Sequence, residues 1–160
     1  MTYVDWIGEL AQRAAASGWR LFYLGGRDGV AAEAAERLRR RAPGLRIATH
    51  PGYFDARAGS SENRAVLQAI RENSPDVLLV GMGMPRQERW IVENLDRLEA
   101  RVVLNAGACF DYVAGVARTP PRWAGRLGLE WLFGWRASRC GWAGATWSSR
   151  GSCCASSCAI

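Results

Sequence analysis

Residues 75–88 read Pro75-Asp-Val-Leu-Leu-Val-Gly-Met-Gly-Met-Pro-Arg-Gln-Glu88. Residues 76–80 form an almost unbroken apolar run, which is typical of a parallel strand covered by helices on both faces. Two glycines and Pro85 follow as a short loop, and the pattern after them predicts a helix over 86–98. Its inward-facing residues are predicted to be Trp90, Ile91, Leu95 and Leu98. The stretch therefore predicts one strand-loop-helix unit of a parallel sheet.

The same alternation extends in both directions along the chain. Apolar, β-rich runs predict further strands over 20–24, 45–49 and 101–104. Helical periodicity predicts helices over 4–16, 29–41 and up to residue 72, the last of them capped by Ser60 or Ser61. This order predicts an α/β fold, a Rossmann-like parallel sheet with helices on both faces, which is an α/β/α sandwich.

Composition and charge exclude several classes of protein. The chain has 160 residues, of which 49% are apolar and 22% charged, as in a soluble globular domain and not a disordered chain. The sequence contains no run of about 18 uncharged apolar residues, so it predicts no membrane-spanning helix. All 21 basic residues are Arg, within a net charge of +6. Total absence of Lys indicates GC-rich coding more than a surface selected for polyanions, so no nucleic-acid partner is expected.

Three of the predicted strands end at glycine-bearing loops. These loops contain Gly25-Gly26, Gly81 with Gly83, and Asn105 with Gly107. The carboxyl ends of parallel strands meet at one edge of the sheet, where ligands bind in such folds. Glycines let a ligand approach the backbone, and the helices that follow offer free N–H groups to a phosphate. The pattern favours a nucleotide or sugar-phosphate site over glycines that merely end strands.

Several common sites are missing from the sequence. The loop from Gly81 lacks the third glycine of the dinucleotide fingerprint, and no phosphate-binding loop of the G-x-x-x-x-G-K-[ST] type exists. An NAD-dependent oxidoreductase and the commonest ATPases are therefore disfavoured. No closely spaced acidic pair suggests a Mg²⁺ site, and the lone His50 has no partner for zinc, so no metal site is expected.

Taken together, these motifs resemble the WecG/TagA/CpsF glycosyltransferases. The resemblance covers residues 2–133 nearly continuously, and the segment from Pro75 to Trp90 is its most specific part. The other matching segments are Leu24-Gly-Gly26, Pro51-Gly-Tyr-Phe54, Gly107-Ala-Cys-Phe-Asp111 with Gly115, and Gly128-Leu-Glu-Trp131.

The resemblance implies an inverting, metal-independent hexosyltransferase without a cofactor. The donor is a UDP-sugar, typically UDP-N-acetylmannosamine, and the acceptor is a polyprenyl-diphosphate-linked sugar, typically undecaprenyl-diphospho-N-acetylglucosamine. Such reactions serve the synthesis of cell-surface polysaccharide or teichoic acid, in the cytoplasm at the inner face of the plasma membrane. The chemistry requires a base for the acceptor hydroxyl and hydrogen-bond donors for the leaving UDP.

The resemblance also implies roles for individual residues. Gln87 and Glu88, in the first turn of a helix, are expected to hydrogen-bond the ligand, although a capping pair is the plainer interpretation. Tyr53 and Phe54 are expected to wall in the base or sugar, with packing under their loop as the alternative. Asp111 is expected to bind ribose or to organise its loop. The expected substrate-binding residues are Gly25, Gly26, Tyr53, Phe54, Gly81, Gly83, Pro85, Gln87, Glu88, Asn105, Gly107, Asp111 and Arg118.

Arg118 is the weakest of these candidates. Its guanidinium group is expected to bind the diphosphate of the donor. The family usually has Arg-Ala-Pro before the tryptophan that corresponds to Trp123, whereas Thr119-Pro120-Pro121 stands there in this chain. Trp90, Trp123 and Trp131 are expected to be core residues and not sugar platforms.

Two departures from the family limit the expected activity. The aspartate that serves as the family's base is expected in a segment that would precede residue 1, so no catalytic residue is assigned. Residues 131–160 hold three Arg, no acid and four of the five Cys, and residues 134–160 are expected to be a disordered frameshift product after a UDP-sugar-binding part over 1–133. Little or no transfer by this chain is therefore expected, and a non-catalytic nucleotide-binding or interaction module is the alternative. An exposed sheet edge and apolar face favour a homo-oligomer.

Overall fold

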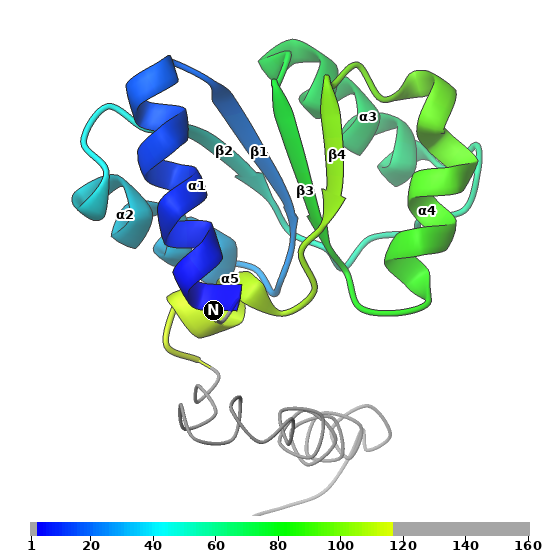
Figure 1. The fold of residues 1–160 in the computed structure, drawn as a ribbon. Helices are drawn as coiled ribbons and strands as arrows, with labels where there is room; N and C mark the ends of the chain where they lie inside the picture. Colours follow the sequence, from blue (N-terminus) through cyan, green and yellow to red (C-terminus); the bar gives the residue numbers. More distant parts are fainter. Residues whose placement is uncertain (1–2, 117–160) are drawn as a thin grey trace, which may run out of the picture. The chain divides into compact units, whose positions relative to one another are not determined.

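The computed structural model describes residues 3–116, with side chains from residue 6 onward, as a sheet between two layers of helices (Figure 1). Four strands form the sheet in the spatial order β2-β1-β3-β4, and every neighbouring pair is parallel. Their bounds are β1 Arg20–Gly25, β2 Arg46–His50, β3 Val77–Gly81 and β4 Val102–Asn105. This architecture confirms the predicted α/β Rossmann-like fold.

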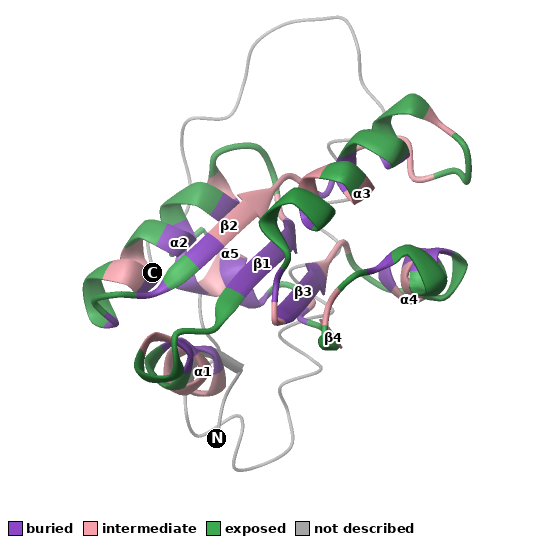
Figure 2. Ribbon diagram, turned by 90° about the horizontal axis from the view of Figure 1, so that it is seen from above, coloured by how far each residue is buried: buried purple, intermediate pink, exposed green. Residues whose placement is uncertain are grey.

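Helices cover both faces of the sheet (Figures 1 and 2). Helices α1 (Tyr3–Ser17), α2 (Val30–Arg41) and α5 (Cys109–Val113) share one buried apolar cluster with the sheet. Helices α3 (Ser61–Asn73) and α4 (Arg86–Asn94) share the other. The predicted cap of α3 is Ser60, whose hydroxyl accepts the Asn63 N–H at 3.0 Å.

The strands β1 and β3 lie at the centre and are buried on both faces. Along β3, Val77 and Leu79 face the cluster with α1, α2 and α5, whereas Leu78 and Val80 face the cluster with α3 and α4. Successive side chains of a strand point to opposite faces, so burial of both faces requires the continuous apolar run seen in the sequence.

Two local features differ from the sequence prediction. Helix α4 ends at Asn94, and a 3₁₀ turn, η1 (Leu95–Arg97), replaces the last predicted turn. The tighter winding rotates the side chains, so Leu95 is 56% exposed and its predicted inward position is wrong, while Leu98 is buried. Helix α5 was not predicted, because five residues between two glycines are too few to show a helical period.

The strand order places the topological switch point between β1 and β3. The chain leaves β1 for β2 on one side and returns through α3 to β3 on the other side. The crevice outside the carboxyl ends of these two strands is the usual ligand position in open α/β sheets. Within residues 3–116, β2 and β4 are the two edge strands, and the predicted self-association through an exposed sheet edge and apolar face stays a prediction.

Candidate functional site

Four loops meet at the carboxyl edge of the sheet. Gly25 of β1 and Gly81 of β3 are register partners, and the Gly26 N–H donates to the Gly81 carbonyl oxygen at 3.3 Å. The Gly52 N–H, from the loop after β2, donates to the Gly26 carbonyl oxygen at 3.0 Å. The Ala106 N–H, after β4, donates to the Val80 carbonyl oxygen at 2.7 Å. The glycine-bearing loops predicted to share one edge are therefore hydrogen-bonded into one floor.

Close backbone packing explains glycine at two of these positions. A β-carbon on Gly25 would lie 2.3 Å from the Gly81 carbonyl oxygen, and one on Gly81 would lie 2.5 Å from the Gly107 carbonyl oxygen. Gly83 and Gly107 are different: their φ angles are +81° and +50°, and their β-carbon positions are open. Glycine is thus required by contact at the first pair and by backbone conformation at the second.

The first turn of α4 brings Gln87 and Glu88 to this edge. Pro85 is the N-cap of the helix, and the Gln87 N–H donates to the Gly83 carbonyl oxygen at 3.0 Å. The Gln87 side chain is 3% exposed, and its Nε2 donates to Glu88 Oε1 at 2.8 Å. This hydrogen bond, with a longer one from Asn105 Nδ2, lowers the pKa of Glu88. Glu88 is therefore a carboxylate at neutral pH.

Two buried oxygens of this turn have no hydrogen-bond partner among the described residues. They are Gln87 Oε1 and Glu88 Oε2, and both are shielded from solvent. Buried polar atoms in native proteins are normally satisfied, and each exception needs an explanation. Since both atoms are acceptors, they call for a hydroxyl or N–H group and not for a phosphate oxygen. The turn is suited to hold the hydroxyl groups of a sugar or ribose.

A second group of residues approaches the same edge from the opposite face of the sheet. Tyr23 of β1 stacks on Phe110 of α5, with ring centroids 3.5 Å apart. Burial raises the pKa of Asp111, the residue next to Phe110, and Arg27 lowers it in part. Desolvation is the main reason that the pKa of Tyr23 is raised, and the charges of Asp111, Cys109 and Tyr53 add to it. Tyr53 and Asp111 are thus both near Tyr23.

The two aromatic residues predicted to wall in the ligand are placed differently. Tyr53 is 72% exposed, in the loop that follows β2. Phe54 packs edge-on against Trp90 at 6.3 Å between ring centroids, and its carbonyl oxygen accepts from Arg86 Nη2 at 2.5 Å. Phe54 therefore joins the loop to α4, while Tyr53 remains available to a ligand. Trp90 is 1% exposed, which agrees with its predicted place in the core.

Arg27 is a candidate that sequence reasoning missed. It follows Gly25-Gly26 in the loop before α2 and is exposed near Asp111. Its position directly after the glycine pair was the available signal, because that loop leads into a helix N-terminus. Arg118, Trp123, Trp131 and the predicted tail over 134–160 lie outside the described residues.

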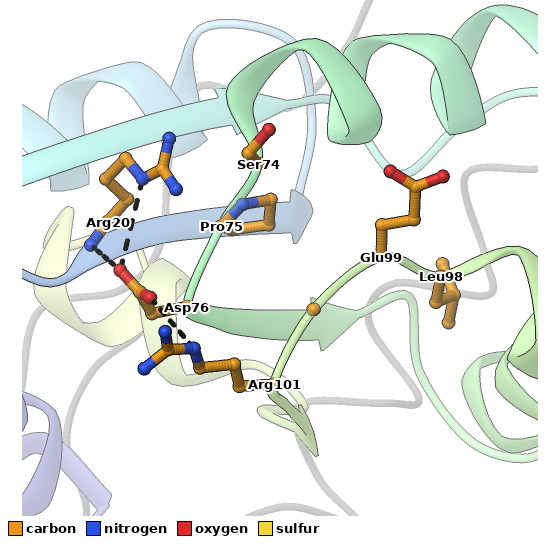
Figure 3. Close-up of a pocket in the computed structure, with 8 residues that line it drawn as sticks. Arg20, Ser74, Pro75, Asp76, Leu98, Glu99 and Arg101 are labelled. Carbon is orange, nitrogen blue, oxygen red and sulfur yellow. Dashed lines mark hydrogen bonds and ion pairs between the residues drawn. The ribbon is translucent and has the colours of Figure 1, made fainter.

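A shallow hollow opens at the opposite edge of the sheet, where the strands begin (Figure 3). The Asp76 carboxylate makes the main polar contacts in it. It accepts the backbone N–H of Arg20 at 2.8 Å and lies 3.6 Å from Arg101 Nε. These contacts tie the start of β1 to the segments before β3 and β4. The hollow is an ion-paired junction of strands, remote from the glycine loops.

Neither a metal centre nor a membrane span was found in the described part of the chain. Residues 3–116 contain no cluster of three or more His, Cys, Asp or Glu side chains placed to hold a metal ion. None of the helices described over that range is long and apolar enough to cross a bilayer.

Comparison with known proteins identifies the class to which this fold and site belong. Residues 1–138 match the glycosyl transferase WecG/TagA/CpsF family, and the chain belongs to that family. Relatives from Staphylococcus aureus strains MRSA252, NCTC 8325 / PS 47 and COL are each 29% identical to it over 130 residues. Each is named N-acetylglucosaminyldiphosphoundecaprenol N-acetyl-beta-D-mannosaminyltransferase. The match covers 81% of this chain but 49% of each relative, so the chain spans about half the length of these relatives.

Proposed function

We propose that this chain forms the nucleotide-sugar site of a glycosyltransferase. The reaction is transfer of N-acetylmannosamine from a UDP-sugar to a sugar linked to polyprenyl diphosphate. Family membership supports the reaction class, and the name of the Staphylococcus aureus relatives supports the transferred sugar and the type of acceptor. The observation on which the proposal mainly rests is the pair of buried, unpartnered acceptor oxygens on Gln87 and Glu88 at the carboxyl edge.

The acceptor pair favours a sugar over a bare phosphate. A carboxylate oxygen that is shielded from water repels phosphate oxygens, whereas it accepts a strong, charge-assisted hydrogen bond from a hydroxyl. The hydrogen bond from Gln87 lowers the pKa of Glu88, and Oε2 of the same carboxylate has no partner among the described residues. A ribose or hexose offers several hydroxyls, which suits two acceptor oxygens on consecutive residues. We assign Gln87 and Glu88 to hydroxyl groups of the UDP-sugar.

The leaving diphosphate requires positive groups at the same edge. Arg27, exposed in the loop between β1 and α2, is the described arginine best placed for this role, because its charge also reaches Asp111. The N–H groups at the start of α2 add the positive end of a helix dipole. Arg118 stays a second candidate. Stabilisation of the UDP leaving group by these residues would take the place of a metal ion. Inversion would follow if the acceptor hydroxyl, losing its proton to a base, formed its bond to the anomeric carbon on the face opposite to the bond that breaks to UDP.

The test is the binding of UDP-N-acetylmannosamine to the 160-residue chain, measured by titration calorimetry. Glu88→Gln keeps the size of the side chain but replaces an acceptor oxygen by an NH₂ donor. We expect this variant to bind about tenfold more weakly, the typical worth of one hydrogen bond to a charged group. Glu93→Gln, an exposed position of the same helix, is the matched control and is expected to bind normally.

Three further titrations separate the proposal from its alternatives. UDP is expected to bind, NAD is not, and chelation of divalent metal with EDTA is expected to leave binding unchanged. If neither UDP nor the UDP-sugar produced heat, the chain would be an interaction module and the proposed function would be wrong. If Glu88→Gln bound as tightly as the unsubstituted chain, the site would lie elsewhere.

A further inference from the structure

The Tyr23 hydroxyl is a buried polar group that the proposed binding roles leave unused. The side chain is 0% exposed, and Oη has no hydrogen-bond partner among the described residues. A phenol that is buried usually finds a partner, because an unsatisfied hydroxyl loses its hydrogen bonds to water without compensation. A phenylalanine at this position would avoid that loss while keeping the stacked ring. The hydroxyl therefore calls for a role.

The hydroxyl lies directly beneath the floor of the candidate site. A β-carbon on Gly25 would lie 2.7 Å from Oη, and one on Gly81 would lie 2.5 Å from it. The tip of the ring thus occupies the space that side chains at both switch-point residues would need. Stacking on Phe110 fixes the ring from α5. The Tyr23 side chain therefore packs between the sheet and α5, and its hydroxyl lies at the carboxyl ends of β1 and β3.

Asp111 is the charged residue beside this hydroxyl. A β-carbon on Gly26 would lie 3.8 Å from Tyr23 Oη and also 3.8 Å from Asp111 Oδ1, so the two oxygens flank one point above Gly26. Asp111 follows Phe110 directly in α5, and the stacked rings therefore set the position of its backbone. Arg27 is the cation that faces it. The carboxylate is half-buried, and burying a charged group is costly unless hydrogen-bond donors satisfy it.

We propose that Tyr23 is a positioning residue of the ligand-bound site, whose hydroxyl donates a hydrogen bond to the Asp111 carboxylate when Asp111 accepts a hydroxyl of the nucleotide. This inference rests on the proposed function, because it assigns the same crevice to the same ligand. Stacking on Phe110 holds the ring, so the hydrogen bond would form by rotation of the Asp111 side chain. One carboxylate oxygen then faces Tyr23 and the other faces the ligand. The unsatisfied hydroxyl of the free chain becomes satisfied on binding.

The test is a double-mutant cycle with Tyr23→Phe and Asp111→Ala, with UDP as the probe. Tyr23→Phe is expected to weaken UDP binding about tenfold, while the thermal midpoint of the free chain stays the same or rises. In the Asp111→Ala background, which has no acceptor at residue 111, Tyr23→Phe is expected to have no further effect on binding. Tyr112→Phe is the matched control. It removes a hydroxyl from the residue that follows Asp111 in the sequence, and it is expected to bind UDP normally.

Each outcome bears on the inference. If Tyr23→Phe bound UDP as tightly as the unsubstituted chain, the positioning role would be wrong while the proposed function stood. Effects that added independently in the double variant would also overturn it, as would a lower thermal midpoint with unchanged affinity, which marks a purely structural residue. If the unsubstituted chain bound no UDP at all, the proposed function would fail, and the role of Tyr23 with it.

Discussion

Gly25 and Gly81 face each other across the two central strands, so close that a side chain on either would strike backbone atoms. The Gly26 N–H closes this contact by donating to the Gly81 carbonyl oxygen. The carboxyl edge is therefore built by direct contact of loop backbones, with the tip of Tyr23 filling the space beneath. This floor is tightly packed, and its geometry depends on residues that do not contact a ligand.

A methyl group at residue 81 tests this dependence. In Gly81→Ala the β-carbon would lie 2.5 Å from both the Gly107 carbonyl oxygen and Tyr23 Oη. One of these neighbours is backbone and the other is a clamped ring, so neither can move away cheaply. We expect the free energy of unfolding to fall by about 1–3 kcal/mol, the usual cost of overpacking, in urea unfolding followed by circular dichroism.

Gly8→Ala is the matched control for that prediction. Gly8 lies in α1, and a β-carbon there has no atom within 4 Å. Alanine favours a helix over glycine by about 0.5–1 kcal/mol, so this variant is expected to be more stable than the unsubstituted chain. A Gly81→Ala protein that unfolded at the same urea concentration as the unsubstituted chain would show that the glycine contact is looser than described.

A buried polar network joins α3 to α4. The Asn63 Oδ1 accepts from Trp90 Nε1 at 2.7 Å, and its Nδ2 donates to Asn94 Oδ1 at 3.1 Å. Asn63→Ala would strand both partners inside the protein, so we expect a loss of about 2–4 kcal/mol of unfolding free energy. Gln68→Ala, on the exposed side of α3, is expected to change it by less than about 0.5 kcal/mol. Similar losses for the two variants would contradict the proposed importance of the network.

Sequence reasoning could predict the fold because its cues are local. The apolar run of β3, the glycines at strand ends and the capping serine of α3 each lie within a few residues of the element that they determine. The first turn of α4 was also within reach, because Pro85 marks its start. Even the meeting of the glycine loops follows from a general property of parallel sheets.

The rest of the site depends on distances that the sequence does not contain. In the sequence Tyr23 is one more apolar residue of a buried strand, and nothing shows that its hydroxyl reaches under two glycines on different strands. The burial of Gln87 depends on how α4 packs, and its neighbour Glu88 is equally consistent with a solvent-exposed cap. Short α5 carries Asp111, yet it has too few residues for a periodic pattern.

Acidification should remove the contribution that the Asp55 carboxylate makes to the stability of the folded chain. Hydrogen bonds from Arg57 lower the pKa of this exposed carboxyl to about 2 in the folded chain. Its contribution to stability is therefore present above the pKa of about 4 in the unfolded chain, and it is lost as pH falls toward 2. We expect Asp55→Asn to be less stable than the unsubstituted chain at pH 7, with the difference shrinking as pH falls below 4. Urea unfolding at several pH values measures this.

The contribution of Asp111 to stability should change with pH in the opposite direction to that of Asp55. Burial raises the pKa of its carboxyl, so the folded chain binds a proton more readily than the unfolded chain, and stability falls as pH rises from about 4 through the folded pKa. Asp111→Asn removes this cost. We expect the variant to be more stable than the unsubstituted chain at pH 7 and equal to it near pH 4, in the same urea series. A variant that was less stable at pH 7 would mean that Arg27 outweighs burial, and that Asp111 serves the fold more than the ligand.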